Sequence, residues 1–418
     1  MTDITILPSK LVGQVEVPPS KSDVHRAIIC AALAKGRSVI SPVAYSQDIL
    51  ATLDCIRAMG ADAQINEDSV VIDGTNTFKN GSKEFFCRES GSTVRFFIPL
   101  ASAGGLSAVF SGEGRLPMRP LDVYSELLPK HGVSCKTQGG LPFEISGKLQ
   151  SGTFDVTGSI SSQFITGLMF ALSTLDGDSV IHLTSPLQSK GYIDMTINVM
   201  RRFGVIVEER DGDYYIKGGQ KYTPCEYRTE GDWSQAAFFL TAGALGGDVT
   251  VKGLRQDSAQ GDKEIAGLLK RFGADVEVLE DSVRCKANEL CGIEIDASQI
   301  PDLVPILSVC GAFAKGRTRI YNAQRVRLKE SDRLAAMKNA LSNVGADIEE
   351  TDDGLLINGK ASVQGGFSDG CNDHRIVMSM AVAALRSENG VTVSDSESIK
   401  KSYNNFFEDY RSVGGKTK

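Results

Sequence analysis

The segment "PPSKSDVHR" (residues 18–26) places cations and hydroxyl groups where a helix is expected to begin. Two prolines precede Lys21, Ser22 and Arg26, and an apolar run, "AIICAALA", follows. Acidic residues are usually favoured in the first turn of a helix, because they complement its free amide groups and partial positive charge. Cations at this position indicate that the negative charge belongs to a ligand, such as a phosphate or a carboxylate.

Polar segments of the same kind recur along the chain. The basic residues collected from them are Lys21, Arg26, Arg95, Arg115, Arg119 and Lys190 in the first half and Lys329, Arg333, Arg375, Lys400 and Lys401 in the second. Arginine matches the oxygen atoms of carboxylate and phosphate, and lysine acts as a point charge or proton donor. We expect both sets to hold a ligand with several negative charges between the two halves. For any single cation, the alternative is a surface ion pair with Glu89, Asp332 or Asp373.

Two acidic residues are candidates for proton transfer. Asp302 lies in "IPDLV" among apolar residues, where desolvation is expected to raise its pKa toward that of a useful base. Its alternative role is a helix N-cap. "KESDR" places Lys329, Glu330 and Arg333 together, and its alternative is a capping box with Ser331 as the cap, plus helical ion pairs.

The remaining polar residues narrow the chemistry. "SSQF" (161–164) offers two hydroxyls and an amide, which suit a polyhydroxylated ligand. The chain has nine cysteines and four histidines but no CxxC pair, HExxH motif or Cys/His cluster, so no metal site is expected. Glycine-rich nucleotide motifs are also missing, and no cysteine has an obvious partner base.

An internal repeat organises the chain. An amphipathic helix, a glycine and an alternating strand recur, as in "CIRAMGADAQI" and "LLKRFGADVEV", about every 70 residues. The glycines are Gly60, Gly132, Gly204, Gly273, Gly345 and Gly414. A second phrase, an apolar helix followed by a glycine and a short strand, recurs with nearly the same period at Gly36, Gly105, Gly177, Gly247, Gly316 and Gly390. Each glycine is expected to end a helix in the left-handed region.

The repeat predicts an α/β protein of two similar domains, each of three βαβαββ units. The sixth copy stops at "SVGGKTK", so we expect the N-terminal strand "DITIL" to complete it. Six such units are too many for one core, which favours a division into three plus three. The predicted domains are residues 15–225 and residues 1–14 with 226–418.

Composition limits the class of protein. The chain has 418 residues, 41% hydrophobic and 23% charged, with a formal net charge of −7. This charge disfavours a general nucleic-acid surface, so any anion site must be local. The N-terminus "MTDITILPSK" lacks a signal pattern and no apolar run approaches a membrane span. A cytoplasmic protein is therefore expected, with reduced thiols.

The chain resembles the 5-enolpyruvylshikimate-3-phosphate synthases over essentially its whole length. The segments that carry the resemblance are "PPSKSDVHRA", "ESGSTVRF", "RLPMRP", "GSISSQF", "QSKGYID", "IPDLVP", "RLKESDR", "NDHRI" and "KKSYNNFF". The resemblance implies two domains with the active site in the cleft between them. It also implies transfer of the enolpyruvyl group of phosphoenolpyruvate to the 5-hydroxyl of shikimate 3-phosphate, with release of phosphate. It implies no cofactor, no nucleic-acid or membrane partner, and a monomer.

The resemblance also implies roles for individual residues. Asp302 would orient the 5-hydroxyl and take its proton, and Glu330 and Lys21 would carry protons for the enol carbon and the departing phosphate. Shikimate 3-phosphate would be bound by Lys21, Ser22, Arg26, Ser161, Ser162, Gln163, Ser189, Asp302 and Lys329, with Tyr192 nearby. Phosphoenolpyruvate would be bound by Lys21, Gly91, Arg119, Gln163, Arg333, Arg375 and Lys401.

This sequence departs from the pattern of the family in places. Glu89 and Ser92 stand in "ESGS" where many members have "NAGT", and "AQRVRL" is longer than in many relatives, so we assign no binding role to Asn322, Arg325 or Arg327. Gly91 keeps the glycine associated with sensitivity to glyphosate, a mimic of phosphoenolpyruvate. Two alternatives stay open: the sister enzyme that acts on UDP-N-acetylglucosamine, and a non-catalytic protein that binds phosphorylated metabolites. The stretch "SGEGRLPMRP" lacks the reactive cysteine of the sister enzyme.

Overall fold

The computed structural model describes residues 2–79 and 84–418, which form two compact units. The N-terminal unit is Pro19–Thr229. The C-terminal unit combines Glu230–Lys418 with the segment that ends at Pro18. The sequence placed both divisions slightly earlier, after residues 14 and 225.

Within the described residues, the strands form six four-stranded sheets, three in each unit, and all six share one topology. The first strand in spatial order is parallel to the second, and the second, third and fourth are antiparallel. In the N-terminal unit the sheets are β14 (Glu226–Arg228), β3 (Arg37–Ser41), β5 (Val70–Asp73), β4 (Asp62–Ile65); β6 (Glu84–Phe86), β7 (Ala108–Ser111), β9 (Phe143–Gly147), β8 (Val133–Lys136); and β10 (Thr153–Val156), β11 (Ser179–Leu183), β13 (Asp213–Ile216), β12 (Val207–Arg210). In the C-terminal unit they are β2 (Val12–Glu16), β15 (Asp248–Lys252), β17 (Ser282–Lys286), β16 (Asp275–Val278); β18 (Glu294–Asp296), β19 (Arg317–Tyr321), β21 (Leu355–Asn358), β20 (Asp347–Glu350); and β22 (Gly366–Ser368), β23 (Val391–Val393), β1 (Ile4–Leu7), β24 (Lys416–Thr417).

The helices follow the same repeat. The N-terminal unit contains α1 (Lys21–Leu33), α2 (Gln47–Ala58), α3 (Gly91–Ala103), η1 (Leu116–Met118), α4 (Asp122–Leu127), η2 (Leu128–His131), α5 (Ser162–Leu172) and α6 (Lys190–Arg202), where η marks a short 3₁₀ helix. The C-terminal unit contains α7 (Trp233–Ala244), η3 (Gly261–Lys263), α8 (Glu264–Phe272), η4 (Pro301–Leu303), α9 (Val304–Ala312), η5 (Gln324–Leu328), α10 (Arg333–Asn343), α11 (His374–Ala383), η6 (Ala384–Arg386), η7 (Ser396–Lys401) and α12 (Phe406–Ser412). No helix among the described residues combines the length and the apolar character that crossing a membrane requires.

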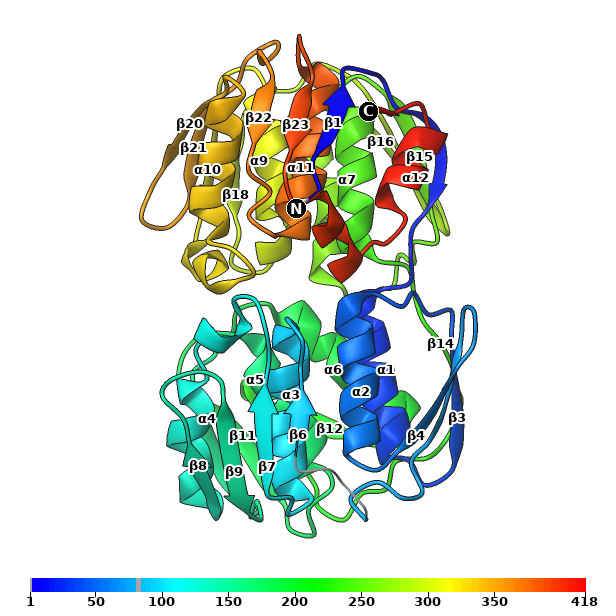
Figure 1. The fold of residues 1–418 in the computed structure, drawn as a ribbon, viewed down its shortest axis with the longest axis vertical. Helices are drawn as coiled ribbons and strands as arrows, with labels where there is room; N and C mark the ends of the chain where they lie inside the picture. Colours follow the sequence, from blue (N-terminus) through cyan, green and yellow to red (C-terminus); the bar gives the residue numbers. More distant parts are fainter. Residues whose placement is uncertain (1, 80–83) are drawn as a thin grey trace. The chain divides into compact units, whose positions relative to one another are not determined.

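The core of the C-terminal unit is built on three helices that are buried on every side. All residues of α7, α9 and α11 are buried, and the three helices pack against one another (Figure 1). Helices that are apolar all round have no face suited to water, so they are stable only at the centre of a fold. Their N-terminal ends are therefore fixed positions from which polar side chains are presented.

The glycines of the repeat end helices as expected, with two exceptions. All six glycines of the first phrase have φ between 83° and 110°. In the second phrase, Gly177 and Gly247 do not have positive φ. At Gly247 space requires glycine, because an added Cβ would collide with the main-chain carbonyl oxygen of Leu11, whereas at Gly177 it would meet the hydroxyl group of Ser151.

The two units exchange strands along the chain. The strand β2 precedes α1 of the N-terminal unit, yet it pairs with β15 of the C-terminal unit. The strand β14 precedes α7 of the C-terminal unit, yet it pairs with β3 of the N-terminal unit, whereas the predicted division put residues 226–228 in the second half. The strand β1 lies between β23 and β24 and so fills the gap in the sixth repeat.

Candidate active site

The predicted ligand-binding residues of the N-terminal unit lie at the starts of its helices. Lys21 and Gly91 are the first residues of α1 and α3. Ser161 is the N-cap of α5, and Ser189 is the N-cap of α6. The free amide groups at these ends are donors for anionic oxygen atoms. Ser22 and Ser162 share these positions, in the first turns of α1 and α5.

Arg26 is buried among neutral oxygen atoms. Its Nε donates to Thr196 Oγ1 at 2.8 Å, Nη1 to the Ser22 carbonyl at 2.7 Å and Nη2 to the Tyr192 carbonyl at 3.1 Å. The guanidinium also lies 5.4 Å from the centre of the Phe96 ring. Burial lowers the pKa of Arg26 to about 10, so the group stays charged at neutral pH. This arrangement fixes the guanidinium and joins α1 to α6.

Gln163 connects α5 to α3. Its Oε1 accepts from Arg95 Nη1 at 2.7 Å and its Nε2 donates to Ser92 Oγ at 2.8 Å. Arg95 also donates to the Pro120 carbonyl at 3.2 Å, next to Arg119. The amide of Gln163 is thus held in one orientation by two residues of α3, and Arg95 links it to the last residue of the segment "SGEGRLPMRP" (111–120).

Gly91 and Arg119 are in close contact. A Cβ added to Gly91 would lie 2.5 Å from Arg119 Nη1, so only glycine leaves room for the guanidinium where it is. Arg119 is buried. Two of the residues predicted to bind phosphoenolpyruvate are therefore brought together by the structure.

Asp48 is a neighbour of Lys21 that the sequence analysis did not single out. Lys21 Nζ donates to Asp48 Oδ2 at 2.7 Å, and both side chains are largely buried. Asp48 lies in the first turn of α2, where an acidic residue complements the helix end. That ordinary position gave no signal of a link to Lys21.

In the C-terminal unit, Arg333 joins three carboxylates. It is 1% exposed and donates from Nη1 to Asp302 Oδ1 at 2.8 Å and from Nη2 to Glu330 Oε2 at 2.7 Å. Its Nε donates to Asp373 Oδ2 at 2.9 Å. Burial favours the neutral form of Arg333, but the three carboxylates outweigh it and raise its pKa above the ordinary value. The two predicted proton-transfer residues, Asp302 and Glu330, are thereby held by one guanidinium.

Asp302 does not lie among apolar residues, as its sequence neighbours suggested. Besides Arg333, Lys329 Nζ lies 3.5 Å from its Oδ1 and Arg375 Nη2 lies 3.5 Å from its Oδ2. Arg375 Nη1 also donates to the Asp302 main-chain carbonyl at 3.2 Å. The side chain is 14% exposed. The carboxylate of Asp302 is therefore surrounded by three cationic side chains rather than by apolar ones.

The structure does not show the capping roles that were the alternatives for "IPDLV" and "KESDR". Asp302 lies inside η4, and α9 begins without a side-chain cap. The N-cap of α10 is Asp332, not Ser331, because Asp332 Oδ1 accepts from the Leu334 and Ala335 amides. Ser331 instead donates to Asp373 Oδ2 at 2.9 Å. Both segments therefore present their polar groups to the cluster around Arg333.

Lys401, at the end of η7, donates to the Asn372 carbonyl at 2.7 Å. Asn372 belongs to the segment that leads to Asp373, the N-cap of α11, and to Arg375 in its first turn. The ammonium group of Lys401 is therefore linked through the main chain to the same helix start as Arg375.

Several other cations form ion pairs of the kind proposed as the alternative. Lys190 contacts Asp194 at 2.6 Å and Glu209 at 2.8 Å, and exposed Lys400 contacts Glu397. Arg115 is exposed.

The residues to which we assigned no binding role also have partners within the protein. In the segment "AQRVRL", Arg325 donates to the Ser298 carbonyl at 2.6 Å, and Arg327 pairs with Asp332 at 3.1 Å and with Glu350. The main-chain amide of Asn322, a residue with φ 56°, donates to Asp353 Oδ2 at 3.1 Å, and the side chain of Glu89 lies against Gly114.

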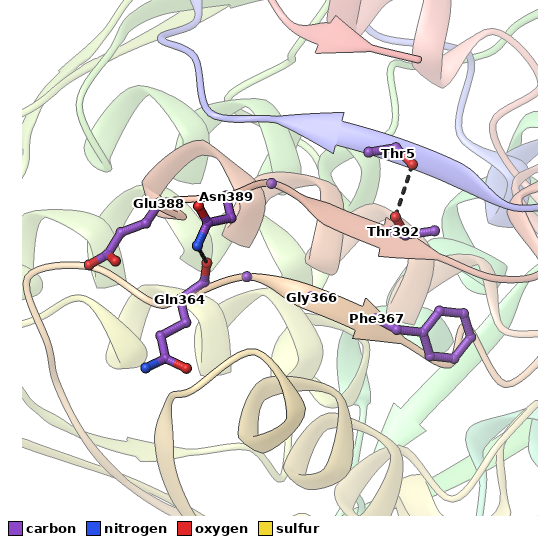
Figure 2. A pocket seen from close by; sticks show the side chains of 9 residues that line it. Thr5, Gln364, Gly366, Phe367, Glu388, Asn389 and Thr392 are labelled. Atoms are coloured by element: carbon purple, nitrogen blue, oxygen red, sulfur yellow. Dashed lines mark hydrogen bonds between the residues drawn. The ribbon is translucent and has the colours of Figure 1, made fainter.

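A hollow of about 600 Å³ lies over the sheet of β22, β23 and β1 (Figure 2). Thr5 and Thr392, which share a hydrogen bond of 2.9 Å, line it together with Phe367, Gln364, Asn389 and Glu388. None of the predicted site residues lines this hollow. Its one charged side chain is the carboxylate of Glu388, which would repel a phosphorylated ligand, so its chemistry does not suit the predicted substrates.

Groups of three or more His, Cys, Asp or Glu side chains that could hold a metal ion are not found within residues 2–79 and 84–418. All nine cysteines are free thiols. What the two units offer instead is hydrogen-bond donors and cations at helix ends, and carboxylates held by Arg333.

Comparisons with known proteins agree with this chemistry. The profile of the family described as EPSP synthase (3-phosphoshikimate 1-carboxyvinyltransferase) matches residues 7–410. The 3-phosphoshikimate 1-carboxyvinyltransferase of Clostridium novyi is 45% identical, with 99% of this chain and 98% of that protein covered, and that of Clostridium perfringens (strain 13) is 44% identical, with 99% of each covered. The solved EPSP synthase of Acinetobacter baumannii is similar over 100% of both chains, with a TM-score of 0.84 and 27% identity. On the match along its length, the fold and the close relatives, this chain belongs to the EPSP synthase family.

Proposed function

We propose that this chain transfers the enolpyruvyl group of phosphoenolpyruvate to the 5-hydroxyl of shikimate 3-phosphate and releases phosphate, with Asp302, Glu330 and Lys21 moving the protons. The family supports the reaction. The observation that supports the residues is that one guanidinium, Arg333, holds both Asp302 and Glu330 at 2.8 and 2.7 Å. A base and an acid fixed to one rigid group keep a constant spacing, which is what two coordinated proton transfers require.

The reaction proceeds in two steps. Glu330, when protonated, donates to the methylene carbon of phosphoenolpyruvate, and Asp302 takes the proton of the 5-hydroxyl as its oxygen adds to the neighbouring carbon. A tetrahedral intermediate forms. Glu330, now a carboxylate, takes a proton back from the methyl group of the intermediate, the bond between the central carbon and the phosphate oxygen breaks, and the double bond returns. Lys21 supplies a proton to the departing phosphate.

Binding is divided between the two units. In the proposal, shikimate 3-phosphate is bound by Lys21, Ser22, Arg26, Ser161, Ser162, Gln163, Ser189, Asp302 and Lys329, and phosphoenolpyruvate by Lys21, Gly91, Arg119, Gln163, Arg333, Arg375 and Lys401. The helix starts of the N-terminal unit support the first assignment, because amide donors and a charged Arg26 suit a phosphate. The cations beside Asp302 support the second, since donors fixed in advance stabilise developing negative charge.

The deciding experiment measures phosphate release by the purified chain. Release is expected with phosphoenolpyruvate and shikimate 3-phosphate together, and not with UDP-N-acetylglucosamine as acceptor. Release with the sugar nucleotide instead would support the sister enzyme, and binding of both substrates without release would support a non-catalytic protein.

The proposal includes a monomeric, cytoplasmic protein, on the resemblance to the family. Light scattering at micromolar concentration is expected to give the mass of one chain, and cell fractionation is expected to recover the protein with cytoplasmic markers. A concentration-independent dimer would contradict the first part, and recovery with the membrane fraction the second.

A further inference from the structure

Asp262 is a buried carboxyl group that neither the sequence analysis nor the proposed mechanism uses. It lies in the single turn of η3 and is 3% exposed. Among the described residues, its Oδ1 has no hydrogen-bond partner. A buried carboxyl oxygen without a partner is unfavourable, and more so when the group is charged, so its presence calls for a reason.

The turn that carries Asp262 packs beside the turn that carries Asp302. Both η3 and η4 contact α7. A Cβ added to Gly261 would lie 3.1 Å from the Gln299 carbonyl oxygen, just before η4. This close approach of two backbones places Asp262 next to the Asp302 cluster, inside the C-terminal unit.

The charges that act on Asp262 come from three elements. They are Asp302 of η4, Arg375 of α11 and Asp232, the N-cap of α7. On its own turn, Lys263 is directed elsewhere, since its Nζ donates to the Ser258 carbonyl at 2.7 Å. Burial raises the pKa of Asp262 to about 6, and the negative charges of Asp302 and Asp232 act in the same direction, against Arg375 and Ser234.

We infer that Asp262 takes up a proton when an anionic substrate group binds to Arg375, so that the charge of Arg375 remains available to the substrate. The inference rests on the proposed function, in which Arg375 binds phosphoenolpyruvate. Asp262 is a positioning residue here: it acts through Arg375 and does not touch the substrate.

The physical reason is charge balance in a place with little water. Before binding, the positive charge of Arg375 faces two carboxylates, Asp302 and Asp262. A bound phosphate or carboxylate adds negative charge to the same group, and the added charge disfavours ionised Asp262 further. Because binding and protonation are linked, phosphoenolpyruvate binds less tightly as the pH rises above the pKa of Asp262 in the free protein.

The test measures phosphoenolpyruvate binding by calorimetry between pH 6 and 8.5. An analogue of shikimate 3-phosphate without the 5-hydroxyl is present, so that no turnover occurs. Buffers of different ionisation enthalpy give the protons taken up per ligand bound. The variants are Asp262→Asn, which keeps the shape without the charge, and the smaller Asp262→Ser.

The matched control is Glu230→Gln. Glu230 is a second carboxyl group whose pKa is raised by burial, and it accepts from Ser258 and Gln260 at 2.9 Å each. Wild type and Glu230→Gln are expected to take up a proton with the ligand. In both Asp262 variants this uptake is expected to be lost, and the ratio of the wild-type Kd to the variant Kd is expected to grow by up to about tenfold for each pH unit above 6.

The outcomes separate this inference from the proposed function. If phosphoenolpyruvate fails to bind to the wild type, or if Arg375→Gln does not weaken its binding, the proposed function fails. If it binds through Arg375 but the Asp262 variants keep the wild-type pH dependence, only the present inference fails. Should both variants fail to fold, the absence of proton uptake by the wild type would still overturn it.

Discussion

Two buried arginines, one in each unit, are held in opposite ways. Arg26, 3% exposed, donates to the neutral oxygen atoms of Thr196, Ser22 and Tyr192. Arg333, 1% exposed, donates to carboxylates, namely Asp302, Glu330 and Asp373. Burial lowers the pKa of Arg26, whereas for Arg333 the carboxylates outweigh burial and raise it.

The difference separates two uses of one side chain. A buried guanidinium held by neutral groups keeps its charge for something that arrives from outside, such as a phosphate. A guanidinium that already neutralises carboxylates serves as a frame, and its role is to fix those carboxylates in place. In the proposal, Arg26 therefore serves binding, whereas Arg333 also fixes two carboxylates, Asp302 and Glu330, that transfer protons.

The largest effect is expected for Asp302→Asn. The amide keeps the shape but cannot take the proton of the 5-hydroxyl, so kcat is expected to fall by about 10²- to 10⁴-fold. Binding of shikimate 3-phosphate, measured by calorimetry, is expected to change little. The control is Asp296→Asn, at an exposed position of β18, which is expected to retain activity. A kcat for Asp302→Asn within a few-fold of wild type would contradict the assignment of Asp302 as the base.

Arg333→Met is expected to lower stability more than Arg26→Met. Removing Arg333 leaves three carboxylates without their common partner, which costs about 3–5 kcal/mol of unfolding free energy. Removing Arg26 leaves its three neutral hydrogen-bond acceptors and one nearby carboxyl group, Asp23, which accepts from Tyr227. Urea denaturation of both variants measures the difference. Equal losses of unfolding free energy would contradict the distinction between Arg333, which holds carboxylates in place, and Arg26, which is available to a ligand.

The difference in stability between wild type and Arg333→Met is also expected to depend on pH. Burial acts to raise the pKa of Asp373, but Arg333 outweighs it and lowers that pKa. The stability that Asp373 contributes through Arg333 is therefore present above its unfolded pKa and is lost as the pH falls through its folded pKa. The gap between wild type and Arg333→Met is expected to narrow below about pH 4. A gap that stays constant down to pH 3 would contradict this.

Arg26→Lys is expected to weaken binding without unfolding the unit. Lysine keeps the positive charge but loses the planar fork that donates to three oxygen atoms, so the affinity for shikimate 3-phosphate is expected to fall about 10- to 100-fold. Calorimetry with shikimate 3-phosphate, and thermal melting of the same sample, distinguish the two effects. An unchanged Kd would show that the N-terminal unit does not use this charge.

Gly91→Ala is expected to have the smallest effect. Its Cβ would displace the guanidinium of Arg119, which lies too close to accommodate it, and the KM for phosphoenolpyruvate is expected to rise by up to about tenfold. Gly267→Ala, within α8, is the control, since only a flexible Glu264 side chain lies near the added Cβ. Inhibition by glyphosate should weaken in parallel. Full activity of the wild type at millimolar glyphosate would contradict the predicted sensitivity.

The sequence predicted the repeat because its signals are local. Six glycines at one period end helices in the left-handed region, and each end can be recognised from its own neighbours. The sequence predicted that the chain crosses between the halves near residues 14 and 225, but not which sheets receive β2 and β14, because a strand pairs with whichever partner the tertiary structure brings to it. Periodicity reveals that a strand exists and not which sheet receives it.

The candidate site shows the same limit. The starts of helices at Lys21, Gly91 and Ser162 were predicted from their polar segments. The surroundings of Asp302 were not, since the adjacent "IP" and "LV" are apolar while its actual neighbours, Arg333 and Arg375, come from later segments. Asp262 was overlooked for a related reason: "QGDKE" resembles an ordinary acidic helix start, and only its burial reveals otherwise.

The strand exchange has a consequence for the order in which the chain folds during synthesis. The ribosome makes β1 and β2 before their partners, because β15 and β23 appear only at residues 248–252 and 391–393. The continuous segment from 19 to 229 leaves the exit tunnel complete while the N-terminal strands are still waiting. Both strands are therefore translated long before they can be incorporated into their sheets, and nascent chains halted before residue 391 must keep an unpaired β1 soluble.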